Sequence, residues 1–205
     1  MKEDKEEIER IKKEKEKYEN NIQKYETFNV KKYNLKIKEK KQIEEWLNLK
    51  MGEILFDSDK DEWSKKTSTF QDKIMNKEKL IIVIEDEENN KFGGYISTKI
   101  NKIGKWIKDS KSFVFSLKSN GRINGMKQFK SKNGEFLMYD KNKYEYLFGI
   151  GRGHDICIKY KEYRTKCYCF QSSYDYDGKE KVLCGKHNGS SFPFTVKRFV
   201  VIQMK

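Results

Sequence analysis

Several residue types are scarce in or missing from this 205-residue chain, and each scarcity limits what it can form. Alanine is absent, proline occurs once, and the first 50 residues contain neither glycine nor proline. A segment without these two helix breakers can form one long helix. Beyond residue 50, short apolar runs alternate with glycine and asparagine turns, as in a β-rich domain. We therefore predict a charged helical arm over residues 1–50 and a folded body over residues 51–205.

The chain also lacks any long apolar run. None reaches the roughly 18–20 residues that a membrane-spanning helix needs. The first residues, MKEDKEEIER, are too charged for a secretory signal. These features predict an intracellular protein, in the cytoplasm, the nucleus or both. In such a compartment the four cysteines are expected to be reduced thiols.

Acidic residues are in deficit. The chain has 45 Lys and Arg against 32 Asp and Glu, which gives a net charge of +13. This excess fits an anionic partner, such as nucleic acid, an acidic protein or anionic lipid. A second explanation is compositional, because heavy use of Lys, Asn, Ile, Tyr and Phe without alanine indicates A/T-rich codons. Such codons would add lysines without any selection for binding.

The arm carries an amphipathic repeat. Ile8, Ile11, Tyr18, Ile22 and Tyr25 recur at spacings of three and four, with Lys15 on the same seam. This is the heptad a/d pattern of a coiled coil, which predicts a homodimer through residues 8–25. The alternative is a single solvated helix that leans on its own body. Trp46, Leu47 and Met51 are expected to dock the arm onto the body.

A lysine-rich segment follows the heptads over residues 31–41. Its lysines are candidates for nucleic-acid binding: Lys31, Lys32, Lys36, Lys38, Lys40 and Lys41. As a helix the segment would present a basic face interleaved with Tyr33 and Leu35, which suits phosphates. The alternative is a solvated connector helix.

The body reads as a series of short strands separated by turns. The expected strands are Leu80–Glu85, Phe92–Ser97, Phe113–Leu117, Glu135–Tyr139, Tyr146–Ile150, Asp155–Tyr160 and Thr195–Met204. Two helices are also expected, over Trp63–Lys77 and Asn101–Lys108. Strands at this spacing predict a β-sandwich.

Four stretches of the body carry a family resemblance. They are ILFDSDKDEWS (54–64), FGGY (92–95), LFGIGRGHDICI (147–158) and FTVKRFVVIQM (194–204). In this order and spacing the body, about residues 51–205, resembles the TLDc domain family, although Asp61-Glu62 stands where the family often has Asp-Gly. The resemblance implies an α+β fold, a β-sandwich flanked by short helices, here preceded by the long charged helix or short coiled coil. It also implies a link to protection against oxidative damage and, as in several members, binding to the vacuolar proton pump. It supplies no catalytic residues.

Three cysteines and a histidine form the pattern C-x-C…C-x-x-H: Cys167, Cys169, Cys184 and His187. A hairpin that turns at Asp177-Gly178 could bring Cys184 back to the C-x-C pair. Soft ligands of this kind could hold zinc. The thiols could instead serve as an oxidation sensor, or be buried as small apolar side chains.

The last third of the chain is rich in basic residues that we expect to be exposed. The nucleic-acid candidates there are Lys159, Lys161, Arg164, Lys166, Lys197 and Arg198. Neighbouring tyrosines could stack on bases while the cations hold phosphate: Tyr160, Tyr163, Tyr168, Tyr174 and Tyr176. The alternative is an ordinary basic surface around an aromatic core.

No set of residues fills the roles of an active site, so no enzymatic activity is expected. On a strand, Asp155 and Cys157 would share one face and His154 would point to the other, which argues against a thiol–histidine dyad. The leading hypothesis is a non-enzymatic protein of the oxidative-stress response that binds a macromolecule. The second is a DNA-binding regulator of stress-responsive genes, and the third is a cysteine redox sensor or zinc module.

Overall fold

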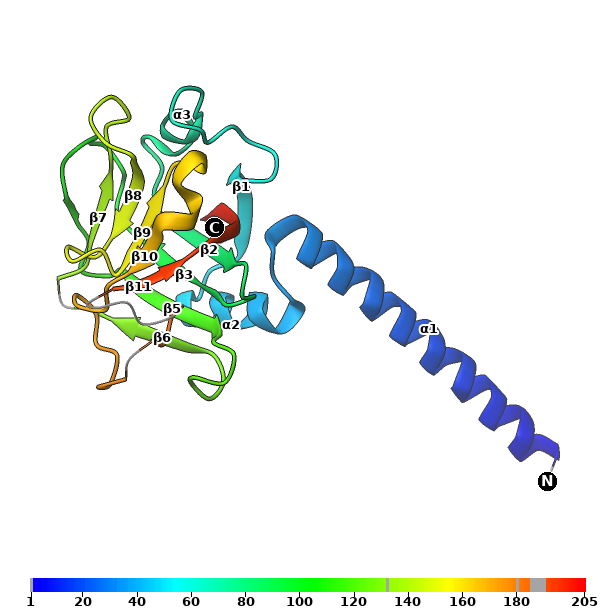
Figure 1. The fold of residues 1–205 in the computed structure, drawn as a ribbon. Helices are drawn as coiled ribbons and strands as arrows, with labels where there is room; N and C mark the ends of the chain where they lie inside the picture. Colours follow the sequence, from blue (N-terminus) through cyan, green and yellow to red (C-terminus); the bar gives the residue numbers. More distant parts are fainter. Residues whose placement is uncertain (1, 132, 180, 185–190) are drawn as a thin grey trace.

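A computed structural model describes residues 2–131, 133–179, 181–184 and 191–205. The chain begins with a long helix, α1 (Lys2–Tyr33), which leads away from the rest of the molecule (Figure 1). A short turn connects α1 to a second helix, α2 (Ile37–Leu47). The body then forms a β-sandwich. No described helix has an apolar stretch long enough to cross a membrane.

Two antiparallel sheets make up the sandwich in the described part of the chain. Sheet A has the strand order β1 (Met51–Asp57), β12 (Val196–Met204), β2 (Leu80–Asp86), β3 (Lys91–Ile96), β5 (Phe113–Lys118) and β6 (Lys127–Lys130). Sheet B has the order β11 (Phe192–Phe194), β10 (Cys167–Cys169), β9 (Ile156–Lys159), β8 (Tyr146–Ile150), β7 (Glu135–Met138) and β4 (Ile107–Lys108). A 3-10 turn, η1 (Lys161–Lys166), connects β9 to β10. The expected α+β sandwich is confirmed.

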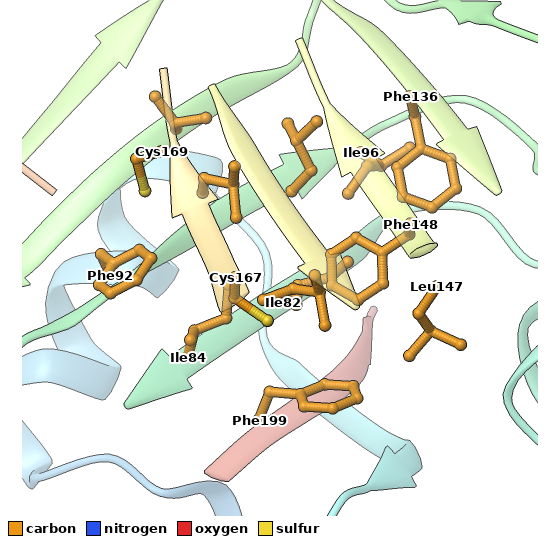
Figure 2. Close-up of a cluster of buried hydrophobic side chains, with 14 of the residues drawn as sticks. Ile82, Ile84, Phe92, Ile96, Phe136, Leu147, Phe148, Cys167, Cys169 and Phe199 are labelled. Carbon is orange, nitrogen blue, oxygen red and sulfur yellow. The ribbon is translucent and has the colours of Figure 1, made fainter. Parts of the chain in front are cut away.

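Apolar side chains from the inner faces of both sheets form the main core (Figure 2). Phe148 of sheet B stacks on Phe70 of α3 (Phe70–Ile74) at 5.3 Å, and Phe56 stacks on Phe199 within sheet A at 5.3 Å. A Cβ on Gly94 would lie 2.8 Å from the Ile150 side chain of sheet B. The FGGY motif therefore lets the two sheets approach closely.

A second core lies on the outer face of sheet A, where α2 packs. The alternate residues Ile81 and Val83 of β2 face this helix, while Ile82 and Ile84 face the main core. Both faces of β2 are thus buried, which explains its uninterrupted apolar sequence. Trp46 of α2 contacts the rings of Phe113 and Phe115. The predicted docking of Trp46, Leu47 and Met51 is confirmed.

The two helices expected in the body do not form as predicted. Residues 101–106 are irregular, because Gly104 has a φ of +69° and Ile107 pairs with Phe136 in sheet B. Between residues 63 and 77 only α3 is helical. The segment before α3 forms turns, closed by a hydrogen bond from the amide of Thr69 to the carbonyl of Glu62.

Candidate functional site

The lysine-rich segment 31–41 is not the single basic helix that the sequence predicted. The chain turns between α1 and α2 because Asn34 adopts a φ of +58°. Tyr33 and Leu35 are buried in the second core, so neither is available between the lysines. Lys40 lies 3.5 Å from Glu44, and Lys32 lies over the Tyr33 ring. The remaining lysines are exposed: Lys31, Lys36, Lys38 and Lys41.

The basic residues of the last third do not form one free surface. Lys159 is buried, contrary to prediction, and pairs with Glu145. Arg198 makes two hydrogen bonds to the carboxylate of Asp57, at 2.8 and 3.0 Å. Two further pairs are Arg164 with Glu87, at 2.9 Å, and Lys197 with Glu85, at 2.8 Å. Lys161 and Lys166 are exposed.

The expected stacking tyrosines are mostly buried. Tyr160, Tyr174 and Tyr176 belong to the main core, with exposures of 0%, 5% and 6%. Tyr163 is partly buried against the same core. The prediction that they stack on bases is therefore wrong for the three buried rings. Tyr168 alone among the five lies on an outer sheet face, as described below.

The cysteines of the C-x-C pair point into the main core from β10 (Figure 2). Cys184 returns to them as predicted and hydrogen-bonds Cys169. Burial raises the pKa of the Cys167 thiol to about 12, and burial also raises the pKa of Cys169 well above its ordinary value. His187 lies outside the described residues. Within the described ranges, no three His, Cys, Asp or Glu residues are placed to hold a metal ion.

A different cluster emerges on the outer face of sheet B. Strand pairing aligns Tyr168 of β10 with Cys157 of β9, and Cys157 with Gly149 of β8. The residues that flank Cys157 and Tyr168 in sequence belong to the main core. Because side chains alternate along a strand, Cys157 and Tyr168 must point outward.

Aromatic side chains surround this position. A bulge between Tyr146 and Phe148 places Tyr146 opposite Lys159, whose ammonium group lies 4.7 Å from the ring centroid. Tyr139, just after β7, lies 5.0 Å from Tyr146 between ring centroids. We call this cluster the aromatic face; its members are Trp106, Tyr139, Tyr146, His154, Cys157 and Tyr168.

His154 lies at the centre of the aromatic face. Its ring is 5.5 Å from Trp106 and 6.1 Å from Tyr168, and its Nε2 atom is hydrogen-bonded to the Tyr139 hydroxyl. A Cβ on Gly149 would lie only 3.0 Å from the His154 ring. Gly149 therefore leaves the space on β8 that the imidazole occupies.

The predicted orientation of residues 154–157 is wrong. His154 and Cys157 belong to the same outer cluster, while the buried carboxylate of Asp155 accepts hydrogen bonds from the amides of Ser172 and Ser173. The reason is local, because His154 adopts a φ of +64° in a turn and β9 begins only at Ile156. Strand alternation does not apply before that residue.

The electrostatics of the aromatic face favour neutral groups. Burial lowers the pKa of His154, so the imidazole stays neutral at pH 7. Burial also raises the pKa of Cys157 to about 12, and the Tyr168 hydroxyl hydrogen-bonds its sulfur. Burial is the largest influence on Lys159 and opposes its charge, but the hydrogen bond and charge of Glu145 together with Tyr146 and Cys157 outweigh it and raise the pKa of the lysine. A neutral thiol beside a neutral imidazole is a poor nucleophile.

A hollow of about 1080 Å³ lies elsewhere on the surface, lined by charged groups of both signs. Its carboxylates already serve the fold. Asp109 accepts hydrogen bonds from the amide and hydroxyl of Ser97, at 2.6 and 2.5 Å. Asp177 pairs with Lys127, and Glu135 lies 3.9 Å from Arg152. The described lining residues do not combine a nucleophile with a base that activates it.

Sequence reasoning missed the aromatic face because its members come from separate segments. A signal does exist, since polar or aromatic residues alternate with core residues in Cys167–Cys169 and Ile156–Lys159. It becomes readable only when the register of the strands is known. The exposed apolar stripe of α1, in contrast, was predicted from the heptads.

Comparison with known families adds one finding. The family model of the TLDc domain matches residues 17–197. The match begins within α1 and includes α2, so it extends further towards the N-terminus than the resemblance over residues 51–205. The packing of α2 against sheet A gives a physical reason for this extension. A search of curated proteins finds no match.

Proposed function

Because the chain belongs to the TLDc domain family, which is generally linked to oxidative stress, we propose that it is a non-enzymatic binding protein of the oxidative-stress response. Its proposed docking surface is the aromatic face, and the proposed occupant is a protein. The observation that carries this proposal is the uncovered state of that face. In the described part of the chain, α2 covers sheet A and no helix covers sheet B from outside (Figure 1).

The chemistry of the face suits protein recognition. Tyrosine and tryptophan supply large apolar areas together with a polar atom, and they are enriched in protein interfaces. Trp106, Tyr146 and Tyr168 are partly exposed, and Tyr144 beside them is 45% exposed. Because Lys159 is neutralised by Glu145, phosphate binding at this position is not favoured.

A non-enzymatic role is supported by the state of the reactive groups. The four cysteines are buried, and the pKa of each of Cys157, Cys167 and Cys169 is raised by that burial. The imidazole of His154 is already engaged by Tyr139. A thiol that stays protonated offers neither a nucleophile nor a readily oxidised thiolate.

The family resemblance suggests the vacuolar proton pump as the partner to test first. Binding of the full chain to the purified pump would be measured by biolayer interferometry. We expect Tyr168→Ala and Trp106→Ala each to weaken binding by about tenfold or more, as for central aromatic anchors. Phe28→Ala on α1, a matched exposed aromatic, should leave the affinity unchanged. Equal loss in all three variants, or no binding by the unmodified chain, would contradict this assignment.

Nucleic acid is a second candidate, which would make the protein a DNA-binding regulator of stress-responsive genes. It is supported by the exposed lysines Lys36, Lys38 and Lys41, which have no carboxylate within ion-pair distance in the described part of the chain. A gel-shift assay across a salt series tests it, since phosphate contacts make affinity fall steeply with salt. Charge reversal at these three lysines should then weaken binding. Absent or salt-independent affinity would exclude this function.

A further inference from the structure

Helix α1 carries a row of large side chains that no other described part of the chain covers. Along one seam the exposures are 52% for Ile8, 54% for Ile11, 67% for Tyr18, 44% for Ile22 and 50% for Tyr25. The next seam position, Asn29, is buried at 1% exposure. The open part of the seam therefore ends at Tyr25, and it lies on a helix that leads away from the body (Figure 1). An exposed stripe of large apolar side chains, here interrupted by Lys15, indicates an interaction surface.

We propose that α1 pairs with α1 of a second copy of this chain as an antiparallel coiled coil. In heptad terms Ile8, Lys15 and Ile22 occupy a positions, and Ile11, Tyr18 and Tyr25 occupy d positions. The two-fold axis passes between Glu16 and Lys17. This assembly is independent of the proposed docking role of the aromatic face.

The core layers favour the antiparallel arrangement. About this axis each a position faces a d position, so Ile8 faces the partner's Tyr25 and Ile11 faces the partner's Ile22. Lys15 faces the partner's Tyr18, where its ammonium group can lie on an aromatic ring. In a parallel pair Lys15 would instead face the partner's Lys15 inside the core, and like charges there repel.

The flanking charges favour the same arrangement. In the antiparallel register, e positions approach e positions, which brings Lys12 next to the partner's Glu19. A parallel pair would place Glu14 next to the partner's Glu19 and create a repulsion. The side chain of Glu19 is 63% exposed, and its contact with Lys15 of its own helix is long, at 4.0 Å. Glu19 is therefore available to a partner.

The length of α1 fits this register. About the proposed axis residue 8 lies opposite residue 25, so the pairing uses the open seam over residues 8–25, which lies within the helix Lys2–Tyr33. At 1.5 Å per residue the two bodies would lie roughly 50 Å apart, at opposite ends. Both aromatic faces would remain open in such a dimer.

Sedimentation equilibrium of the full chain tests the association. We expect a dimer, and we expect Ile22→Glu to weaken dimerisation at least about 100-fold, because it places a charge in the core. Asn20→Glu, a matched substitution on the outward f position, should leave the dimer constant nearly unchanged. Far-UV circular dichroism checks that both variants retain the helix. A chain that stays monomeric at the highest concentration it tolerates would overturn the proposal.

Engineered thiols test the direction of pairing. Oxidation of a mixture of Ile8→Cys and Tyr25→Cys chains should give the mixed 8–25 dimer. Neither variant alone should crosslink, since residue 8 and the partner's residue 8 would be roughly 25 Å apart. The four native cysteines are buried and should not interfere. Crosslinking of Ile8→Cys with itself would establish a parallel pair and overturn the proposal.

One substitution distinguishes the two directions by the sign of its effect. Glu19→Lys should weaken an antiparallel dimer by about tenfold, because it faces Lys12 twice. The same change should tighten a parallel dimer by relieving the repulsion from Glu14. The double variant Lys12→Glu/Glu19→Lys should restore antiparallel affinity. Tightening by Glu19→Lys, or no restoration in the double variant, counts against the antiparallel pair.

Discussion

The two outer faces of the sandwich differ in a way that separates stability from function. On sheet A, α2 closes a second core in which Leu35 and Ile43 are fully buried. On sheet B, aromatic rings cluster around His154 without a helix above them in the described residues. The main core is shared by both sheets, so it cannot account for this difference.

The two outer faces carry different kinds of apolar side chain. Sheet A needs a cover because Ile81 and Val83 on its outer face are aliphatic and make no polar contacts of their own. Sheet B carries rings with hydroxyl, indole and imidazole groups, which can face water or a partner. Substitutions on the outer face of sheet A should therefore mainly lower the stability of the fold. Substitutions on the outer face of sheet B should mainly weaken binding.

The largest effect on stability is expected at the ion pair that holds α2 to sheet A. Glu39 is 3% exposed, lies 3.2 Å from the buried Lys91 and accepts a hydrogen bond from the amide of Lys36. Glu39→Ala would leave the lysine buried without a partner, which costs about 3–5 kcal/mol. Urea unfolding measures this loss. Glu45→Ala, on the exposed side of the same helix, should change stability by less than about 0.5 kcal/mol.

A somewhat smaller loss is expected from a cavity beneath α2. Ile43→Ala removes a fully buried side chain and should lower the free energy of unfolding by about 2–5 kcal/mol. Beside the aromatic face, Tyr144→Ala removes a ring that is 45% exposed and should cost about 0.5 kcal/mol or less. Similar losses in the free energy of unfolding for the two variants would show that both outer faces contribute to stability. That result would contradict the proposed difference between the faces.

The smallest expected effect is a pH dependence that arises on sheet B. Burial lowers the pKa of His154 below its ordinary value of 6.5, so the unfolded chain binds this proton more readily than the folded chain does. Stability from this group is complete above about pH 6.5 and falls as the pH drops towards the lowered pKa. The slope from one group cannot exceed about 1.4 kcal/mol per pH unit.

His154→Asn should remove this part of the pH dependence, because asparagine tolerates the positive φ of +64° at this position. Urea unfolding of both proteins between pH 5 and pH 8 provides the measurement. Taking the difference between them cancels the titration of the groups that the two proteins share. Parallel stability curves for the two proteins would show that His154 is not the group responsible.

The parts of the fold that were predictable share a simple pattern. Each can be read from a short stretch of sequence. Examples are the uninterrupted apolar run of β2, the closing strand β12 and the heptads of α1. The expected helix over 101–108 failed because Ile107 is held by Phe136 from a strand almost thirty residues away. Such a pairing leaves no trace in the local sequence.

The candidate site was harder to predict for the same reason. Tyr146 and Tyr168 lie on strands of sheet B, while Trp106 and Tyr139 lie next to its strands β4 and β7. Only the strand register brings the four rings together. Two local irregularities also mislead simple alternation, namely the bulge after Tyr146 and the turn at His154. The buried state of Lys159 depends on its pairing with Glu145 across β8 and β9.

The central claim, that the open face of sheet B binds a protein partner, is tested most directly by site-specific photo-crosslinking in cells. A benzophenone side chain would replace Tyr144 beside the aromatic face, or the exposed Glu53 on edge strand β1 as the control. Under peroxide stress we predict a discrete protein adduct from position 144 that His154→Asp weakens, and none from position 53. Adducts from position 53 alone, or none from either position, would contradict the claim.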